Sequence, residues 1–451
     1  MGYLPSRYNL TIADRDSQSL LFNCRTGSMV RIPAVLRPVI EALHVEAPFD
    51  LDRDVAPEAR NLIAGLAEAK FFVDEELDEL EAVKAGVAAG PEVRTLNLTI
   101  LPTMGCNLRC TYCYQVRQGL VMREETLEAL VREVEARAAS SEIDGIEVDW
   151  FGGEPLLARG VIAELSARIR EIAGRHGLAY RAVMATNGTL LDDATVELLA
   201  GVGVEEVQIT LDGPPEVHDR TRPRADGAAS FDAVVRGILA ASRRLEVVVR
   251  INVDRHTVGD AWKVLDYLEQ AGCFETGRSV QPYIAAIGPL SSVCSHTCDA
   301  MIPADEFLDH VLAFQEAVLK RCSGVDPAVI LGVPRPVTRA CGAHSELSMC
   351  VHPTGMIHKC GLEVHEPERA AGRVGEAYEE HPNYRKWVDL DPFADPTCAR
   401  CRFLPLCLGG CPKYSRDPDS PYHREACLYF HRYLESTLRL YATTGARPLP
   451  S

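Results

Sequence analysis

The sequence predicts an α/β protein in which helices cover a parallel sheet, with a small α+β domain before it and a cysteine-rich domain after it. Three observations predict this fold class. Six nearly continuous apolar segments alternate with helix-like segments in residues 94–320, a pattern typical of parallel sheets. Residues 1–90 hold short strand-like segments followed by helical periodicity. Cysteines punctuate residues 335–435, where apolar runs are fewer.

The N-terminal domain, residues 1–90, is expected to begin with three short strands, YNLTI, LLFNC and SMVRIP, with a turn at Arg25-Thr26-Gly27. Apolar residues at helical spacing predict helices in AVLRPVIEALHV and in PEARNLIAGLAEAKFFV. An acidic, alanine-rich segment then predicts a helix that leads to a linker at Gly90-Pro91.

The central domain, residues 94–320, is expected to alternate strand and helix. The predicted strands are RTLNLTILP, IEVDWFGG, YRAVMATNG, VEEVQITLDG, LEVVVRINV and SVQPYIAA. The helix-like segments between them include REETLEALVREVEARAA, VIAELSARIREIAG and DAWKVLDYLEQAG. In such folds the chemistry lies at the C-terminal ends of the strands, and the motifs described below follow those ends.

Composition excludes several classes of protein. A chain of 451 residues has room for about three domains. It has no apolar stretch of 18 residues and no signal peptide at its start, so we expect a cytoplasmic protein with no membrane partner. The formal net charge of −17 disfavours nucleic acid. Sixteen cysteines in a reducing compartment indicate metal binding or catalysis rather than disulfides.

The first cysteine group follows the first predicted strand of the central domain. It has the spacing Cys106-x3-Cys110-x2-Cys113. Three thiolates in one loop can bind three irons of a [4Fe–4S] cubane and leave the fourth iron open, whereas electron-transfer cubanes have four cysteine ligands. The alternatives are half of a zinc site, although zinc sites usually have a second nearby pair, or a chance cluster.

This spacing, with Tyr112 before the third cysteine, resembles the radical S-adenosylmethionine (SAM) superfamily. The resemblance implies a partial (β/α)6 TIM-like barrel whose open iron binds SAM. One electron then cleaves SAM to methionine and a 5′-deoxyadenosyl radical, which abstracts hydrogen from the substrate. The cofactor supplies the difficult chemistry, while the protein aims the radical and excludes water.

Further positions match the family's SAM contacts. Gly152, Gly153 and Glu154 resemble the glycine-rich segment that meets the SAM amino group, where glycine permits close approach. Asn187 matches a recurrent strand end. Thr210 matches a ribose contact, or is an ordinary strand residue. Arg222 matches a contact to the SAM carboxylate, because the planar guanidinium can make two hydrogen bonds to a carboxylate. The alternative is that Arg222 makes a surface ion pair. We interpret His218 and Asp219, in the same loop, as structural.

The second cysteine group resembles the SPASM extension, a cluster-binding domain of radical SAM enzymes that act on peptides and proteins. The run Cys398-x2-Cys401-x5-Cys407-x3-Cys411 carries this resemblance. It implies two auxiliary [4Fe–4S] clusters, three in all. One set of ligands is Cys398, Cys401, Cys407 and Cys427. The other is Cys341, Cys350, Cys360 and Cys411. If Cys350 is not a ligand, one auxiliary iron is open. The alternative is a zinc ribbon with two Zn²⁺ ions.

The other cysteines carry less signal. Cys294 and Cys298, with His296 between them, and Cys322 are a possible metal or relay group, or ordinary thiols. Cys24 and Cys273 are expected to be core thiols. In sulfatase-maturating members an acidic base follows the cysteine of the Gly-x4-Cys motif. Here that position is Gly361, which argues against sulfatase maturation and leaves the catalytic acid or base unassigned.

The leading functional hypothesis is modification of a ribosomally made peptide by thioether or carbon–carbon crosslinking or by epimerisation. The three N-terminal strands followed by helices resemble the winged-helix-like domain that adds a leader peptide as an extra strand; the alternative is a structural cap. The expected partners are a peptide or protein substrate and an electron donor such as flavodoxin or ferredoxin. The alternatives are a small-molecule substrate, or a non-enzymatic iron–sulfur electron carrier.

Overall fold

The computed structural model describes residues 2–13, 19–33, 48–89, 94–140, 142–322, 325–415 and 425–445. The chain divides into two compact units. Unit 1 contains residues 1–92, 327–341 and 390–451, and unit 2 contains residues 93–326 and 342–389. Within the described residues, no helix is long and apolar enough to cross a membrane.

Unit 2 is built on one sheet with the strand order β12-β11-β10-β9-β8-β7-β13-β14-β15. Six of its strands are β7 (Thr95–Ile100), β8 (Gly145–Trp150), β9 (Ala179–Thr186), β10 (Val204–Thr210), β11 (Glu246–Val253) and β12 (Val280–Ala286). Neighbours among these six strands pair in parallel. The six predicted strands and the predicted parallel sheet are therefore confirmed.

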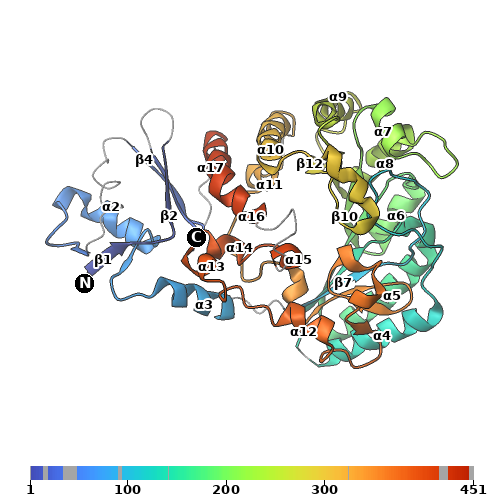
Figure 1. Ribbon diagram of the computed structural model, residues 1–451, viewed down its shortest axis with the longest axis horizontal. Helices are drawn as coiled ribbons and strands as arrows, with labels where there is room; N and C mark the ends of the chain where they lie inside the picture. Colours follow the sequence, from blue (N-terminus) through green and yellow to red (C-terminus); the bar gives the residue numbers. More distant parts are fainter. Residues whose placement is uncertain are drawn as a thin grey trace. The chain divides into compact units, whose positions relative to one another are not determined.

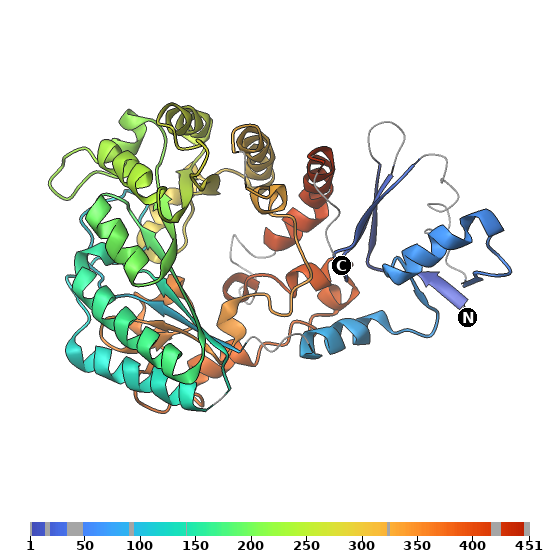
Figure 2. The same cartoon turned by 180° about the vertical axis from the view of Figure 1, so that it is seen from behind.

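Helices follow these strands in the predicted order and cover one face of the sheet (Figures 1 and 2). They are α4 (Glu124–Ala139), α5 (Arg159–His176), α6 (Asp193–Gly201), α7 (Pro215–Thr221), α8 (Phe231–Ala241), α9 (Ala261–Gln270) and α10 (Ala304–Leu319). Buried and half-buried residues alternate along β7 and β8. The fully buried set, such as Leu98 and Trp150, forms the core, whereas Asn97 and Asp149 point to the other face. The face that carries Asn97 and Asp149, called the inner face below, is therefore polar.

Three further strands extend this sheet from the cysteine-rich part of the chain. They are β13 (Ser348–Val351), β14 (Met356–His358) and β15 (Gly372–Arg373), followed by helix α12 (Pro382–Val388). Strand β13 pairs in parallel with β7. These strands carry no clear sequence signal, because they have only two to four residues and β7, the partner of β13, is distant in sequence. They draw residues 342–389 into unit 2, so the compact units do not follow the predicted boundaries.

Unit 1 contains two small antiparallel sheets from the N-terminal part of the chain. The first is β2 (Asn9–Ala13), β3 (Ser19–Asn23) and β4 (Met29–Ile32). The second is β5 (Phe49–Asp50), β1 (Gly2–Pro5) and β6 (Phe72–Asp74). The first sheet confirms the three predicted strands. The predicted helix at residues 34–45 lies outside the described residues, and the winged-helix-like arrangement stays a prediction.

One predicted N-terminal helix is shorter than expected. Helix α2 is Pro57–Glu68, and the FFV segment at its predicted end belongs instead to β6 and the residue before it. Lys70 has a positive φ of 66°, which ends the helix and turns the chain. Phe71 and Phe72 are then buried in the core of this unit, because tertiary packing outweighs the local helical pattern. Helix α3 is Glu79–Ala89.

The C-terminal part of unit 1 packs against these N-terminal elements. Its helices are α11 (Pro327–Leu331), α13 (Pro396–Arg400), α14 (Leu404–Cys407), α15 (Pro412–Ser415), α16 (Glu425–Leu428) and α17 (Leu434–Thr443). The Arg31 guanidinium donates to the Ala442 carbonyl over 2.9 Å, and Lys84 lies over the Phe393 ring. The N-terminal strands and the cysteine-rich segment therefore fold as one body.

Candidate active site

The three cysteines of the first group lie in the loop after β7, at the C-terminal end of the sheet. A second segment runs alongside this loop: the Arg109 N–H donates to the Pro223 carbonyl over 2.7 Å, and the Thr111 N–H donates to the Thr221 carbonyl over 2.9 Å. The loop is therefore held by backbone pairing that does not depend on metal.

The donor set of this loop fits an iron–sulfur cluster. Cys106, Cys110 and Cys113 are free and half-buried, and the Leu108 N–H donates to the Cys106 sulfur over 3.4 Å. Burial raises the pKa of Cys110 to about 11, with Arg222 acting in the opposite direction. A metal is therefore needed to hold this thiolate. Among the described residues, no group of three or more His, Cys, Asp or Glu side chains is placed to hold a metal ion.

The glycine pair after β8 packs directly on the cysteine loop. A Cβ on Gly153 would lie 2.2 Å from the Gly105 carbonyl oxygen, and one on Gly152 would lie 2.4 Å from the Thr103 carbonyl oxygen. The Glu154 N–H donates to the Gly105 carbonyl over 2.8 Å. Glycine is thus required at these two positions because the backbone after β8 packs directly on the backbone of the cysteine loop. The sequence motif alone does not show this reason.

Glu154 joins this turn to the end of β9. Its fully buried carboxylate accepts hydrogen bonds from the Asn187 N–H (2.7 Å), the Thr186 hydroxyl (2.8 Å) and the Leu156 N–H (3.1 Å). Burial raises the pKa of Glu154, and these hydrogen bonds act against that shift. The Asn187 side chain in turn donates to Asn107 over 2.8 Å and lies 3.9 Å from the Cys106 sulfur. Glu154 and Asn187 therefore brace the cysteine loop.

Tyr112 and Arg222 meet at a buried carboxylate that the sequence analysis did not single out. The Tyr112 hydroxyl donates to Asp212, the Arg222 guanidinium donates to the Tyr112 oxygen over 2.6 Å, and Arg222 lies 3.8 Å from Asp212. The Asn252 N–H also donates to Asp212 over 2.8 Å. Arg222 is only 6% exposed, so it makes no surface ion pair. Its buried Nε has no hydrogen-bond partner among the described residues.

His218 and Asp219 have the structural contacts expected of them. The His218 Nδ1 accepts a hydrogen bond from the Asp212 N–H over 3.0 Å. Burial, and then the charge of Arg222, lowers the pKa of His218 to about 3, so the ring is neutral. Asp219 accepts from the Ser230 and Phe231 N–H groups at the start of α8, at 2.8 and 2.9 Å.

A polar row lines the inner face of the sheet beside this loop. Thr210, the predicted ribose contact, is half-buried at the end of β10 and is the cross-strand neighbour of Arg250. Arg250 donates to Asn252 over 2.8 Å, and the Tyr283 hydroxyl donates to Gln208 over 2.8 Å. The alternation of polar and apolar residues in VVVRINV and VEEVQITLDG could have predicted this polar row from the sequence.

Asp149 is an isolated carboxyl group on the same inner face, on β8. Burial, and then the nearby carboxylates of Glu147 and Glu206, raises the pKa of Asp149 to about 6. Glu147 has a cation partner, since Arg181 lies 2.6 Å away. Asp149 has no hydrogen bond or ion pair among the described residues, so it carries an uncompensated charge above that pKa.

The predicted auxiliary ligands are distributed over both units. In unit 1, Cys398, Cys401, Cys407 and Cys427 are electrostatic neighbours: burial raises the pKa of Cys398 to about 11 and of Cys407 to about 12, and the other cysteines of the set reinforce both shifts. These thiols therefore lie within electrostatic range of one another, and their role as one ligand set stays a prediction.

The second predicted ligand set has members in each unit and stays a prediction. Cys341 and Cys411 belong to unit 1, whereas Cys350 and Cys360 belong to unit 2. Burial, and then Cys360, raises the pKa of Cys350. Cys350 is 3% exposed and packs with Leu101, Met104 and Val364, so an apolar wall surrounds this thiol.

The remaining cysteines are mostly ordinary buried thiols. The Cys294 sulfur points at the carbonyls of Ser291 and Gly288, Cys298 is exposed, and Cys322 and Cys273 are buried. The His296 ring bonds to the Thr111 carbonyl over 2.8 Å, so it supports the cysteine loop. Cys24 is fully buried as expected, and Arg402, Cys401 and Cys407 are among its electrostatic neighbours.

A parallel α/β sheet with a three-cysteine loop at its C-terminal edge is the arrangement expected of a radical SAM domain. Residues 100–268 match the Radical SAM superfamily. The chain therefore carries a radical SAM domain, and it is homologous to anaerobic sulfatase-maturating enzymes. The cysteine-type enzyme of Clostridium perfringens is 25% identical over 370 residues, which cover 75% of this chain and 95% of that protein.

Solved structures share the fold. Native anSMEcpe with bound AdoMet aligns with a TM-score of 0.58 at 21% identity and covers 77% of this chain and 99% of its own. Streptococcus suis SuiB bound to its precursor peptide SuiA aligns with a TM-score of 0.51 at 13% identity and covers 92% of this chain and 97% of its own. At these identities the likeness establishes the α/β radical SAM fold.

Replacing Gly153 with alanine should disable the cysteine loop. The new Cβ would push the Gly105 carbonyl away, so we expect loss of about four iron atoms per chain and at least a tenfold loss of SAM cleavage, measured as 5′-deoxyadenosine. Gly160→Ala is the matched control, because nothing lies within 4 Å of its added Cβ. Equal iron content and SAM cleavage in the two variants would contradict this account of the glycine pair.

Replacing Asp149 with asparagine should stabilise the fold at high pH. An unfolded aspartate has a pKa of about 3.9, below the folded value of about 6. Protonation of Asp149 therefore favours the folded state, and this contribution is complete below about pH 4 and lost as the pH rises through about 6.

We expect Asp149→Asn to raise the free energy of unfolding at pH 8 by about 1–3 kcal/mol and to change it little at pH 4, as measured by denaturant unfolding. Glu147→Gln is the control, since it removes the carboxylate that Arg181 neutralises and should not stabilise. A pH-independent effect of Asp149→Asn would contradict the shifted pKa.

Proposed function

We propose that this chain is a radical SAM enzyme that modifies a peptide or protein, with one SAM-binding cluster and two auxiliary clusters. The observation that carries the proposal is the convergence of the cysteine loop, the Gly152–Glu154 turn and Asn187 at the ends of three parallel strands. A bound cluster and SAM supply a 5′-deoxyadenosyl radical for hydrogen abstraction. The chain's own residues hold the loop, position SAM and exclude water.

The proposed SAM contacts divide into two groups. Gly152, Gly153 and Asn187 lie against the cysteine loop, where backbone groups can meet the SAM amino group. Thr210 and Arg222 lie on the β10 side, and the unpartnered Nε of Arg222 is a donor available to the SAM carboxylate. Tyr112 and Asp212 hold Arg222 in place, which restricts its fork to one orientation.

A peptide substrate is supported by the relatives and by the N-terminal strands. SuiB binds a precursor peptide, and anSMEcpe has been solved with the Cp18Cys peptide. We propose thioether formation, carbon–carbon crosslinking or epimerisation of a ribosomally made peptide. We do not favour sulfatase maturation, because Gly361 has no side chain at the position of the family's base. A flavodoxin or ferredoxin would supply electrons.

The leader peptide would bind along β4, at the edge of its sheet. A groove of about 350 Å³ lies between β4 and α2 and is lined by Ser28, Met29, Val30, Asn61, Leu62, Gly65, Leu66, Ala69 and Phe71. An edge strand offers backbone hydrogen bonds, and an apolar groove beside it offers pockets for alternate side chains. Both features occur together here.

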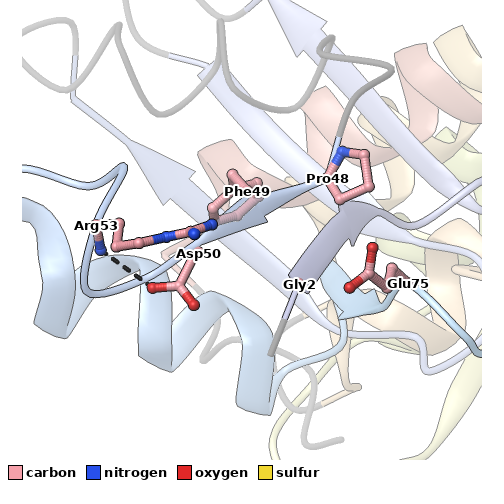
Figure 3. Close-up of a pocket in the computed structure, with 6 residues that line it drawn as sticks. All are labelled: Gly2, Pro48, Phe49, Asp50, Arg53 and Glu75. Carbon is pink, nitrogen blue, oxygen red and sulfur yellow. Dashed lines mark hydrogen bonds between the residues drawn. The ribbon is translucent and has the colours of Figure 1, made fainter.

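A second cavity in the N-terminal strands is a weaker candidate. It has a volume of about 390 Å³ and lies at the β5–β1 edge (Figure 3). Its lining includes Asp50, Arg53 and Glu75, and the Arg53 N–H donates to Asp50 over 3.0 Å. A lining that carries these three charged side chains offers little to an apolar anchor.

Replacing Cys106, Cys110 and Cys113 together with alanine should abolish SAM cleavage. The intact reconstituted protein should hold about 12 iron atoms, and the variant about eight, because the auxiliary ligands are untouched. Iron analysis and 5′-deoxyadenosine formation under reducing, anaerobic conditions measure both. Undiminished cleavage would refute the assignment of this loop, and stoichiometric zinc with a single cubane would favour the zinc-ribbon alternative.

Replacing Leu62 with glutamate should weaken binding of the cognate precursor peptide by about tenfold or more, because a buried charge in the groove disfavours an apolar anchor. Uncoupled SAM cleavage should stay unchanged. Val329→Glu is the matched control, since Val329 is an exposed apolar residue of the same unit. This point substitution is preferable to deleting residues 1–90, which would strip packing from the auxiliary cysteines. If Leu62→Glu binds the precursor peptide as tightly as the wild type, residues 1–90 are a structural cap and not a recognition domain.

A further inference from the structure

A short segment of unit 2 that follows β12 reaches the cysteine loop through two side chains. Residues 291–300 form this segment and are called the clasp below. The Ser291 hydroxyl donates to the Tyr114 carbonyl over 2.8 Å, and the His296 Nε2 lies 2.8 Å from the Thr111 carbonyl oxygen. Because a carbonyl oxygen only accepts hydrogen bonds, the His296 Nε2 carries the proton of this bond.

The clasp joins the two ends of the six-stranded parallel arc. Thr111 and Tyr114 lie in the loop after β7, whereas the clasp follows β12, and four strands separate β7 from β12 in the sheet, namely β8, β9, β10 and β11. Hydrogen bonds between these two loops can form only because the parallel strands curve and bring their C-terminal ends together. The clasp therefore closes a ring of loops that the sheet leaves open between β12 and β7.

Contacts inside the clasp and at its end hold it in shape. Cys294 is fully buried, and its sulfur points at the Ser291 carbonyl over 3.4 Å. The Thr297 hydroxyl donates to the Cys294 carbonyl over 2.8 Å. Just beyond the clasp, the Arg255 guanidinium donates twice to the Met301 carbonyl, over 2.9 and 3.2 Å. The clasp is thus a braced segment from which Ser291 and His296 extend.

The two carbonyls that the clasp binds lie on either side of Cys113. Thr111 precedes Cys113 by two residues, and Tyr114 follows it directly. The contacts of Cys113 within its own loop are long: its N–H donates to the Cys110 carbonyl over 3.4 Å, and its sulfur lies 3.8 Å from the Gln115 carbonyl oxygen. Typical N–H···O bonds measure about 2.9–3.0 Å, so the clasp makes the shorter contacts around this cysteine.

The other two cysteines of the loop have supports from other directions. Cys106 lies beside Asn187, whose side chain approaches its sulfur at 3.9 Å, on the side of the glycine turn. Cys110 lies between the two N–H groups that pair with the carbonyls of residues 221 and 223. Each of the three thiols therefore has its own neighbouring segment, and the clasp is the segment next to Cys113.

We propose that the clasp positions the Cys113 thiol for iron binding, with Ser291 and His296 as the positioning residues. This inference rests on the proposed function, because it assumes that Cys113 is a ligand of the SAM-binding cluster. His296 is exposed, so water competes with it for the Thr111 carbonyl. Loss of either bond should therefore raise the population of displaced Cys113 by about fivefold, as expected for one ordinary hydrogen bond.

The clasp also accounts for three residues that the sequence presents as a possible metal or relay group. The Cys294 sulfur points at carbonyls of its own segment, and the His296 Nε2 binds Thr111. Cys298 is exposed. Among the described residues, no group of three or more such side chains is placed to hold a metal ion. The contacts of Cys294 and His296 are those of a support for the cysteine loop.

The test measures the reactivity of each thiol in the metal-free full chain. Iodoacetamide labels the native protein under anaerobic conditions, and peptide mass spectrometry gives the labelling rate of each cysteine. We expect His296→Ala and Ser291→Ala to speed the labelling of Cys113 by about fivefold, and to change the rates of Cys106 and Cys273 by less than about twofold. Equal Cys113 rates in the wild type and both variants would overturn the proposal.

Conservative variants and a control separate positioning from a general loosening of the fold. His296→Gln retains a side-chain N–H donor and Ser291→Thr retains the hydroxyl, so both should label Cys113 as slowly as the wild type does. His256→Ala is the matched control, since His256 is an exposed histidine whose ring makes no hydrogen bond or ion pair among the described residues. Faster labelling of every cysteine in the alanine variants would overturn the specific role at Cys113.

Reconstituted protein gives a second measurement and separates this proposal from the proposed function. Iron release to the chelator bathophenanthroline should be about fivefold faster in both alanine variants and should return to the wild-type rate in the Gln and Thr variants. A chain that cleaves SAM and releases iron equally fast in wild type and alanine variants would overturn the clasp and leave the proposed function intact. A chain whose Cys113 labelling responds to the clasp, but which binds no iron and cleaves no SAM, would overturn the proposed function instead.

Discussion

The candidate active site depends on the contact between the glycine turn after β8 and the backbone of the cysteine loop. At Gly152 and Gly153 the approach is too close for any Cβ, and hydrogen bonds from Gly153 and Glu154 to the loop carbonyls fix its path. Glu154 then passes this constraint to β9 through the Asn187 N–H. One buried carboxylate and two glycines thereby hold three strand ends in register, so the thiols are placed before any cluster binds.

The buried group of Asp212, Tyr112 and Arg222 constrains the other side of the loop. Taking a carboxylate and a guanidinium out of water is expensive unless their remaining donors and acceptors are bonded. Here the Tyr112 hydroxyl lies between the two ions, and Asn252 bonds to both the tyrosine and the carboxylate. The Arg222 Nε is buried without a hydrogen-bond partner among the described residues, which is costly, and an anionic ligand would satisfy it.

Much of the fold was predictable because local signals agreed with each other. The six parallel strands and their helices follow from apolar runs with period-two or helical spacing. The predictions were weaker where contacts with residues distant in sequence determine the secondary structure. Strand β13 forms because it pairs with β7. Phe72, predicted to be helical, lies in a strand because its side chain packs in a hydrophobic core. At the site, the motifs identified the loop, the glycine turn and Arg222. Asp212, Arg250 and Asp149 were missed because a strand pattern does not show which polar residues converge in space.

The N-terminal strands and the predicted auxiliary cysteines Cys398, Cys401 and Cys407 belong to one compact unit, so the proposed substrate recognition and the proposed cluster binding would be linked. The contacts run in both directions, from Arg7 to the cysteine segment and from Arg402 back to β2, and Cys24 is buried with Cys401 and Cys407 among its neighbours. Because ligand binding to the folded state stabilises the segments packed around the ligand, iron bound as proposed by Cys398, Cys401 and Cys407 would also stabilise the β2–β3 sheet. The proposed leader groove at β4 belongs to that sheet, so its shape would depend on a filled cluster site. An N-terminal domain studied alone would lack this support.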